Sequence, residues 1–313
     1  MLRQPSFAVI PAIVLASTFS VYGQAPAGQG GAQGRGAAPP PAPMAIKQVK
    51  PGLFMVTGIG GNSTVRVTEQ GVILVDTKNL GDGPYNDLMA QIKILTNQPV
   101  KYVFVTHVHQ DHSGNIGRFV KAGAQVITHA GLKKNLETGG ADGKGYTSPA
   151  GKPDPPNVTF SRDREVSLGR AKAKAYHFAN AHTGGDAIVY FPDLKVVSLG
   201  DEFVAQTPNA DYPDGGSVLG WPKALAEVLK LDFDVAIPGH GNDPLTKADV
   251  QAFQKKMDAI ARKAVELRKQ GVAKEQIRQQ IQAQLPDMAP WMMTGVVNDM
   301  RLDAFYAEIS SAK

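Results

Sequence analysis

Three of the seven histidines in the chain fall within six residues, from His107 to His112, and Asp111 lies among them. The apolar stretch 101–106 before them predicts a buried strand, and a helical pattern follows. Side chains at i and i+2 of an extended segment point the same way, so His107 and His109 can face one point. Asp111 and His112 come where the chain turns toward the helix and can face a second point nearby. One short loop can therefore supply ligands to two neighbouring cations, which indicates a metal site.

The chain contains no cysteine. This excludes disulfides, thiolate ligands and a catalytic cysteine. A metal must therefore be held by imidazole and carboxylate groups, a set that suits zinc, iron or manganese.

Composition places the chain among ordinary globular enzymes. Its 313 residues suffice for one large domain or two small ones, with 42% hydrophobic and 19% charged residues. The formal net charge of +5 comes without a block of Lys and Arg, so nothing favours a nucleic-acid partner. We expect a small-molecule substrate.

The first residues predict an export signal. Arg3 precedes an apolar stretch from Phe7 to Val21, and the residues up to Gly23 resemble a small-residue cleavage site. Because the stretch is short for a span of about 20 apolar residues, cleavage after residues 1–23 is favoured over a retained membrane anchor. We expect a periplasmic or secreted product without stable membrane insertion.

Residues 24–45 predict a disordered linker. From Gln24 to Pro43 every residue except Arg35 is Gln, Ala, Pro or Gly. Such a segment cannot bury enough apolar surface to offset the entropy cost of ordering it. Folded structure is therefore expected from residue 46.

Short strands alternate with helical patterns from residue 46 to residue 245. Strands are expected at 53–57, 63–68, 71–76, 102–106, 125–128, 158–160, 165–168, 171–177, 187–191, 195–199 and 235–237. Helices are expected at 87–95, 116–120 and 221–231, and a long loop at 139–156. Two halves that each begin antiparallel and then alternate strands with helices predict a sheet-on-sheet sandwich flanked by helices.

The remaining residues, 246–313, predict a helical extension. Thr246 and Asp249 form a capping-box pattern, and apolar residues follow helical spacing up to Gly271. Two shorter helices are expected at 274–284 and 291–309. Their apolar faces are expected to pack on the main domain rather than to form a dimer face.

Three further segments place candidate ligands at strand ends or in tight turns. His182 lies in a Gly-rich turn, and Asp201 and His240 each follow a predicted strand. Taken singly, such residues are usually turn, core or helix-capping residues. Because strand ends can converge on one edge of a sandwich, their shared position favours a single site with residues 107–112.

In this order, the motifs resemble those of the metallo-β-lactamase superfamily. The pattern comprises a strand-end aspartate, H-x-H-x-D-H, a histidine in a Gly-rich turn, a bridging carboxylate and a late G-H, here Asp76, His107/His109/Asp111/His112, His182, Asp201 and His240. The resemblance covers residues 46–245. It implies an α/β (α+β) fold, a four-layer αββα sandwich with the metal site at one edge.

The resemblance also implies a role for each residue. One ion is assigned His107, His109 and His182, the second Asp111, His112 and His240, and Asp201 bridges the two. Asp111 is expected to be catalytic as well, orienting the attacking water and passing on a proton. Asp76 is expected to orient a ligand or its loop, and Asp186 either to do the same or to form a turn. Two zinc ions are expected, with iron or manganese as alternatives.

These assignments predict a secreted dinuclear hydrolase that uses a metal-bound hydroxide to cleave a small ester, lactone, thioester or amide. Asp201 stands where β-lactamase subclasses carry Cys or Ser, which favours the broader hydrolase branch. Three alternatives stay open: β-lactam hydrolysis, redox or dioxygenase chemistry in an iron-bearing relative, and a non-catalytic metal-binding or scaffold protein, which the full ligand set disfavours. Loops 58–63, 139–156 and 202–221 could frame the substrate. Their aromatic residues Tyr146, Tyr212 and Trp221 indicate either a partly apolar pocket or simple packing within the loops.

Overall fold

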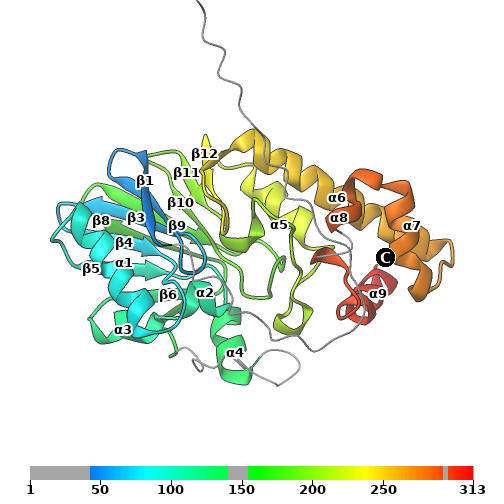
Figure 1. Ribbon diagram of the computed structural model, residues 1–313, viewed down its shortest axis with the longest axis horizontal. Helices are drawn as coiled ribbons and strands as arrows, with labels where there is room; N and C mark the ends of the chain where they lie inside the picture. Colours follow the sequence, from blue (N-terminus) through cyan, green and yellow to red (C-terminus); the bar gives the residue numbers. More distant parts are fainter. Residues whose placement is uncertain (1–42, 140–153, 292–294, 313) are drawn as a thin grey trace, which may run out of the picture. The chain divides into compact units, whose positions relative to one another are not determined.

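A computed structural model of the chain describes residues 43–139, 154–291 and 295–312 (Figure 1). The predicted signal peptide, the linker as far as residue 42, and most of the 139–156 loop lie outside the described residues. Ala45, at the end of the predicted linker, is already the first residue of a strand.

Seven strands of the described chain form a mixed sheet. In spatial order they are β1 (Ala45–Lys50), β2 (Leu53–Thr57), β3 (Ser63–Thr68), β4 (Gly71–Val75), β5 (Val100–Phe104), β6 (Gln125–His129) and β7 (Val158–Phe160). The first four strands are antiparallel neighbours, whereas β4 to β7 run parallel. Parallel neighbours need crossovers, and α1 (Asp82–Leu95), α2 (Gln110–Ser113), α3 (Ile116–Lys121) and α4 (Ala130–Thr138) lie in these connections.

Six further described strands form the second sheet. Their spatial order is β13 (Leu245–Thr246), β12 (Val235–Ile237), β11 (Val196–Ser198), β10 (Ile188–Phe191), β9 (Ala171–Tyr176) and β8 (Asp163–Leu168). Within the described sheet, β11 and β12 are parallel neighbours, and α5 (Trp221–Val228) lies in their connection. The short turns η1 (Gly200–Glu202) and η2 (Tyr212–Asp214) precede α5.

Three buried apolar clusters hold four layers together. The cluster between the sheets includes Ile73 and Phe104 from one sheet and Ala173 and Val189 from the other. A second cluster packs α1, α3 and α4 on the outer face of the first sheet, and a third packs α5 and the C-terminal helices on the outer face of the second. Figure 1 shows this helix–sheet–sheet–helix order, which confirms the predicted αββα sandwich.

The chain after β13 is helical, as predicted. The helices are α6 (Lys247–Lys269), α7 (Lys274–Gln284), η3 (Pro286–Met288), α8 (Ala289–Trp291) and α9 (Leu302–Ser311). At the start of α6 the Thr246 hydroxyl accepts from the Asp249 backbone N–H, and the Asp249 carboxylate accepts from the Thr246 N–H at 2.8 Å, which completes the capping box. No helix among the described residues is long and apolar enough to cross a membrane.

Several elements differ from the sequence-based expectation. A continuous helix over 291–309 is wrong, because α9 begins at Leu302 and residues 295–301 do not continue an α-helix. Gly295 and Asn298 favour turns over helix there. Helix α4 was missed because its N-cap is His129, whose Nδ1 accepts from the Gly131 N–H at 3.2 Å, and histidine is not among the usual capping residues.

Replacing Phe253 by alanine should destabilise the fold strongly. Its ring is 5% exposed and lies near the rings of Phe203, Trp221 and Trp291. We expect a loss of about 3–5 kcal/mol in the free energy of unfolding, since a cavity replaces the ring. Urea denaturation measures this, with the exposed Lys255→Ala on the same helix as a control expected to change stability by less than about 0.5 kcal/mol. Equal effects of both substitutions would contradict this packing.

Candidate metal centre

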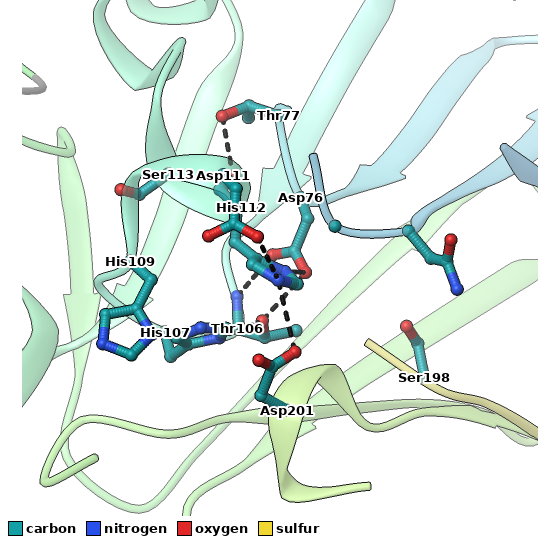
Figure 2. Close-up of polar contacts among 12 residues, drawn as sticks. Asp76, Thr77, Thr106, His107, His109, Asp111, His112, Ser113, Ser198 and Asp201 are labelled. Carbon is teal, nitrogen blue, oxygen red and sulfur yellow. Dashed lines mark hydrogen bonds and ion pairs between the residues drawn. The ribbon is translucent and has the colours of Figure 1, made fainter. Parts of the chain in front are cut away.

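The ends of five segments place the candidate ligands at one edge of the sandwich. Asp76 follows β4, residues 106–112 follow β5, and His182 lies in the turn between β9 and β10. Asp201 follows β11 and His240 follows β12. Figure 2 shows Asp76, the histidine loop and Asp201 converging from separate elements. The strand ends predicted from sequence are thus adjacent in space.

Among the described residues three groups of side chains could each hold an ion; one of them, His109 with Asp211 and Asp214, shares His109 with the first of the two groups that contain the predicted ligands. In both groups one nitrogen or oxygen atom of each residue lies within 4.8 Å of the others; the first contains His107, His109, His182 and Asp201, and the second Asp111, His112 and His240. All seven residues proposed from sequence as ligands are therefore gathered at this edge.

The ring of His107 is oriented by a relay from Asp76. The Asp76 carboxylate can only accept, so Thr106 Oγ1 donates to its Oδ2 at 2.8 Å. The same hydroxyl is then free to accept from His107 Nδ1, 3.0 Å away. This tautomer leaves a lone pair on His107 Nε2, which is buried and has no hydrogen-bond partner among the described residues.

His109 and His182 are held in a comparable way from outside the cluster. His109 Nε2 donates to Asp211 Oδ2 at 2.7 Å, and His182 Nδ1 donates to the Asn209 carbonyl at 2.5 Å. The inward nitrogens, Nδ1 of His109 and Nε2 of His182, then lie 2.9 Å apart. Two lone pairs at this separation favour a shared proton or cation.

The His112 ring lies between two carboxylates, as Figure 2 shows. Its Nδ1 donates to Asp76 Oδ2 at 2.7 Å, and its Nε2 lies 3.2 Å from Asp201 Oδ1. His240 Nε2 is 3.2 Å from Asp111 Oδ2 and 3.4 Å from Asp201 Oδ2. Asp201 therefore faces both groups of ligands.

Without metal, these groups distribute protons unevenly. Burial and the neighbouring His112 hold the pKa of His107 well below its ordinary value. Burial also opposes protonation of His240, but hydrogen bonds with Asp111 and Asp201 outweigh it and raise the pKa of His240 to about 9. Burial opposes ionisation of Asp201 too, yet His112 lowers the pKa of this carboxyl well below normal. The centre thus combines ionised carboxylates with imidazoles that share protons.

Two glycines let backbone approach the ligands closely. A Cβ atom on Gly61 would lie 2.1 Å from the His112 ring, and one on Gly239 would lie 2.0 Å from Asp201 Oδ1. Asn62 links the same two turns, because its Nδ2 donates to the carbonyls of Pro238 and Gly241 at 3.0 Å. The predicted turn at residues 58–62 therefore packs directly on the ligand loops.

Lys78 is a buried residue at the centre that sequence reasoning missed. It is completely buried, with a φ of 66°, and its Nζ donates to the carbonyls of Val56 and Gly61 at 2.7 Å. Burial lowers its pKa to about 7 against the attraction of Asp76 and Asp111. A lysine directly after Asp76-Thr77 could have been noticed, but nothing in the sequence marks it as buried.

The other predicted residues take supporting positions. Asp186 accepts from the backbone N–H and hydroxyl of Thr183, so it closes the turn that carries His182. Burial raises the pKa of Asp186 to about 7. Asp211 lies in the predicted pocket loop 202–221, and its carboxylate contacts His109.

A cavity of about 190 Å³ opens beside the centre. It is lined by His182, Asp201, Val204, Gln206, Thr207, Asn209 and His240. The expected aromatic lining is wrong for Trp221, which is fully buried and donates from Nε1 to the Glu202 carbonyl. Tyr212 likewise points its hydroxyl at Glu308. The described lining is mainly polar and uncharged apart from the candidate ligands.

The donor set fits metal ions. Imidazole lone pairs and carboxylates meet in a buried space, and no thiolate is present. A model of the metallo-beta-lactamase superfamily matches residues 56–240, more than half of the chain. The chain belongs to the metallo-β-lactamase superfamily. It is therefore a metal-dependent hydrolase with a His/Asp metal site, as the sequence motifs predicted.

Proteins similar to this hydrolase are named for different activities, among them a β-lactamase and a subunit of an O-demethylase. It is 30% identical to metallo-beta-lactamase IND-1 of Chryseobacterium indologenes over 60% of this chain and 75% of that protein. It is 26% identical to the alpha subunit of 2,4-dinitroanisole O-demethylase of Nocardioides sp. over 71% of this chain, but only 62% of that subunit. The structure of a metallo-beta-lactamase from Pontibacter korlensis shares the fold, with a TM-score of 0.58 and 21% identity over 69% of this chain and 99% of that one.

Replacing Asp211 by asparagine should weaken metal binding. The variant keeps the size of the side chain but removes the charge that holds His109 Nε2. We expect metal affinity to fall about 10- to 100-fold, as for other outer partners of ligating histidines. Competition with a chromophoric chelator measures this. Asp232→Asn, an exposed aspartate paired with Lys195, is the control expected to bind as the original protein does.

Metal loading should release protons. In the metal-free protein His240 is protonated below its pKa of about 9, and a ligand imidazole must be neutral. Affinity should therefore rise with pH between about pH 6 and about pH 9. Calorimetry in buffers of different ionisation enthalpy counts the protons released. A pH-independent affinity without proton release would show that His240 is not a ligand.

Proposed function

We propose that this hydrolase binds two zinc ions and cleaves a small, uncharged ester, lactone, thioester or amide. His107, His109 and His182 hold one ion, and Asp111, His112 and His240 hold the other. Asp201, which lies near residues of both groups, would be shared between the two sites. The observation that carries the proposal is the buried, unpartnered lone pair of His107 Nε2, which lies among two further imidazoles and Asp201.

Bound zinc supplies Lewis acidity and lowers the pKa of a coordinated water toward 7. The residues of the chain set the geometry of attack. Asp111 is ionised, because His112 and His240 outweigh the effect of burial and lower its pKa. Its carboxylate is 31% exposed and lies 3.2 Å from His240, which lines the cavity, so it can accept a hydrogen bond from a water there and orient a lone pair of that water toward the substrate. Asp111 can then carry a proton to the leaving group.

The cavity supports an uncharged substrate. Gln206, Thr207 and Asn209 offer amide and hydroxyl groups, and Val204 offers an apolar contact. None of the described residues that line the cavity is Lys or Arg. With the proposed zinc ions bound, a substrate carboxylate near Asp201 would be attracted by the ions, but further from them the described lining offers it no Lys or Arg partner.

β-Lactam hydrolysis is the second candidate. The 30% identity to metallo-beta-lactamase IND-1 favours it, and the same hydroxide chemistry suits a strained amide. β-Lactam antibiotics carry a carboxylate, however, and apart from the proposed zinc ions the described lining offers no Lys or Arg side chain to position that group. The O-demethylase relative adds an activated aryl methyl ether to the substrates worth testing.

Export to the periplasm or medium is part of the proposal. Arg3 and the apolar residues up to Val21 support it, as does the cleavage-site pattern before Gln24.

A small-molecule substrate fits the cavity volume of about 190 Å³.

Metal-quantified protein should hydrolyse a neutral member of a substrate panel. The panel comprises lactones, carboxylic esters, thioesters, amides, phosphodiesters, sulfate esters, a nitroaryl methyl ether and β-lactams, each with zinc content measured. We expect the highest kcat/KM on an uncharged ester, lactone, thioester or amide, and a lower one on a carboxylate-bearing analogue. A preference for β-lactams would favour the second candidate. A coloured, iron-loaded protein with oxidative turnover would overturn the hydrolytic proposal.

His109→Ala provides the matching loss of function. It should abolish hydrolysis and lower the bound metal per chain, while circular dichroism shows a folded sandwich. His129→Ala is the control, because His129 caps α4 and stacks on His177 outside both groups of ligands. Normal turnover and stoichiometry in His109→Ala would refute the ligand assignment.

A further inference from the structure

The C-terminal helix α9 reaches the loop beside the metal centre through Glu308. Its Oε2 accepts from the Tyr212 hydroxyl at 2.6 Å and from the Val218 N–H at 3.2 Å. Its Oε1 accepts from the Ser217 hydroxyl and from the Leu219 N–H, the latter at 3.2 Å. One carboxylate therefore binds four donors of the segment 212–219, about 90 residues away in sequence.

The same loop holds the ligands of one candidate ion. Asp211, next to Tyr212, accepts from His109 Nε2, and the Asn209 carbonyl accepts from His182 Nδ1. The backbone is tied to the ligand turn as well, because the Asp211 N–H donates to the His182 carbonyl and the Ser217 N–H to the Ala181 carbonyl, both at 2.8 Å. Movement of this loop would therefore turn the rings of His109 and His182.

A carboxylate suits this position better than any neutral group. Four donors converge on its two oxygens, and hydrogen bonds to an ionised acceptor are about twice as strong as neutral ones. Burial and the proximity of Glu308 raise the pKa of Tyr212, so its hydroxyl stays protonated and donates. Loss of the carboxylate would leave these donors unpaired in a partly buried space.

We propose that Glu308 is a positioning residue of the metal centre, acting through the loop 209–219 on His109 and His182. This inference rests on the proposed function of these two histidines as ligands. The helical extension then has a role beyond packing. Glu308 on α9 fixes the orientation of the His109 and His182 rings through the hydrogen bonds of this loop.

Glu308→Ala and Glu308→Gln test this role on cobalt- and zinc-loaded full-length protein. We expect Glu308→Ala to weaken metal binding about 10-fold, the lower end for outer partners of metal ligands, and to shift the visible ligand-field bands of the cobalt form. Glu308→Gln retains one acceptor oxygen and should fall between the original protein and Glu308→Ala. Tyr212→Phe removes a single contact of the carboxylate, so it gives a milder version of the effect if Glu308→Ala fails to fold.

Asp303→Ala is the matched control. Asp303 lies on the same helix and pairs with Lys274 of α7 at 2.6 Å, so its loss removes a contact between α9 and α7 without touching the loop. We expect Asp303→Ala to keep the original affinity and cobalt spectrum. Equal spectral changes in Asp303→Ala and Glu308→Ala would reduce the effect to general packing and overturn the inference.

The two proposals fail in different ways. Original protein that binds neither cobalt nor zinc would refute the proposed function itself. Original protein that binds cobalt normally, with the same affinity and spectrum in Glu308→Ala and Tyr212→Phe, would refute only the role of Glu308.

Discussion

The candidate metal centre depends on presenting imidazole lone pairs to one partly buried space at the edge of the sandwich. For His107, His109, His112 and His182, an outer hydrogen bond fixes which ring nitrogen faces inward. Asp76 does this directly for His112 and, through Thr106, for His107. Asp211 does it for His109. Because these acceptors are carboxylates or a hydroxyl bound to one, they also make the rings better electron donors. The ligands are therefore oriented before any ion arrives.

Close approach of backbone is the second requirement. The turn at Gly61 touches the His112 ring, and Asn62 ties that turn to the strand end that carries His240. Lys78 Nζ donates to the carbonyls of Val56 and Gly61 and so holds the same turn in place. These contacts join the two sheets at the metal edge, where strand ends alone would leave the loops unsupported. The αββα sandwich provides the frame, and short polar contacts between loops set the final positions.

Sequence reasoning recovered the sandwich and brought the seven candidate ligands together, because both depend on local signals. Strand periodicity marked β2 to β6, and the ligands stand in recognisable motifs at strand ends. The supporting residues were harder. Asp211, Lys78 and Glu308 act across 17 to 102 positions of sequence, and each looks like an ordinary surface residue in its own segment. The predicted aromatic lining of the pocket was wrong for the same reason. Trp221 is an aromatic residue in a predicted pocket loop, but its side chain is buried in the core.

Each group of ligands draws on both sheets. His107 and His109 meet His182 from the second sheet, and Asp111 and His112 meet His240. A growing chain has an incomplete first group until residue 201 has been synthesised, and an incomplete second group until residue 240 has been synthesised. With the proposed ligands, neither ion could be fully coordinated before strands of both sheets have been made and brought together.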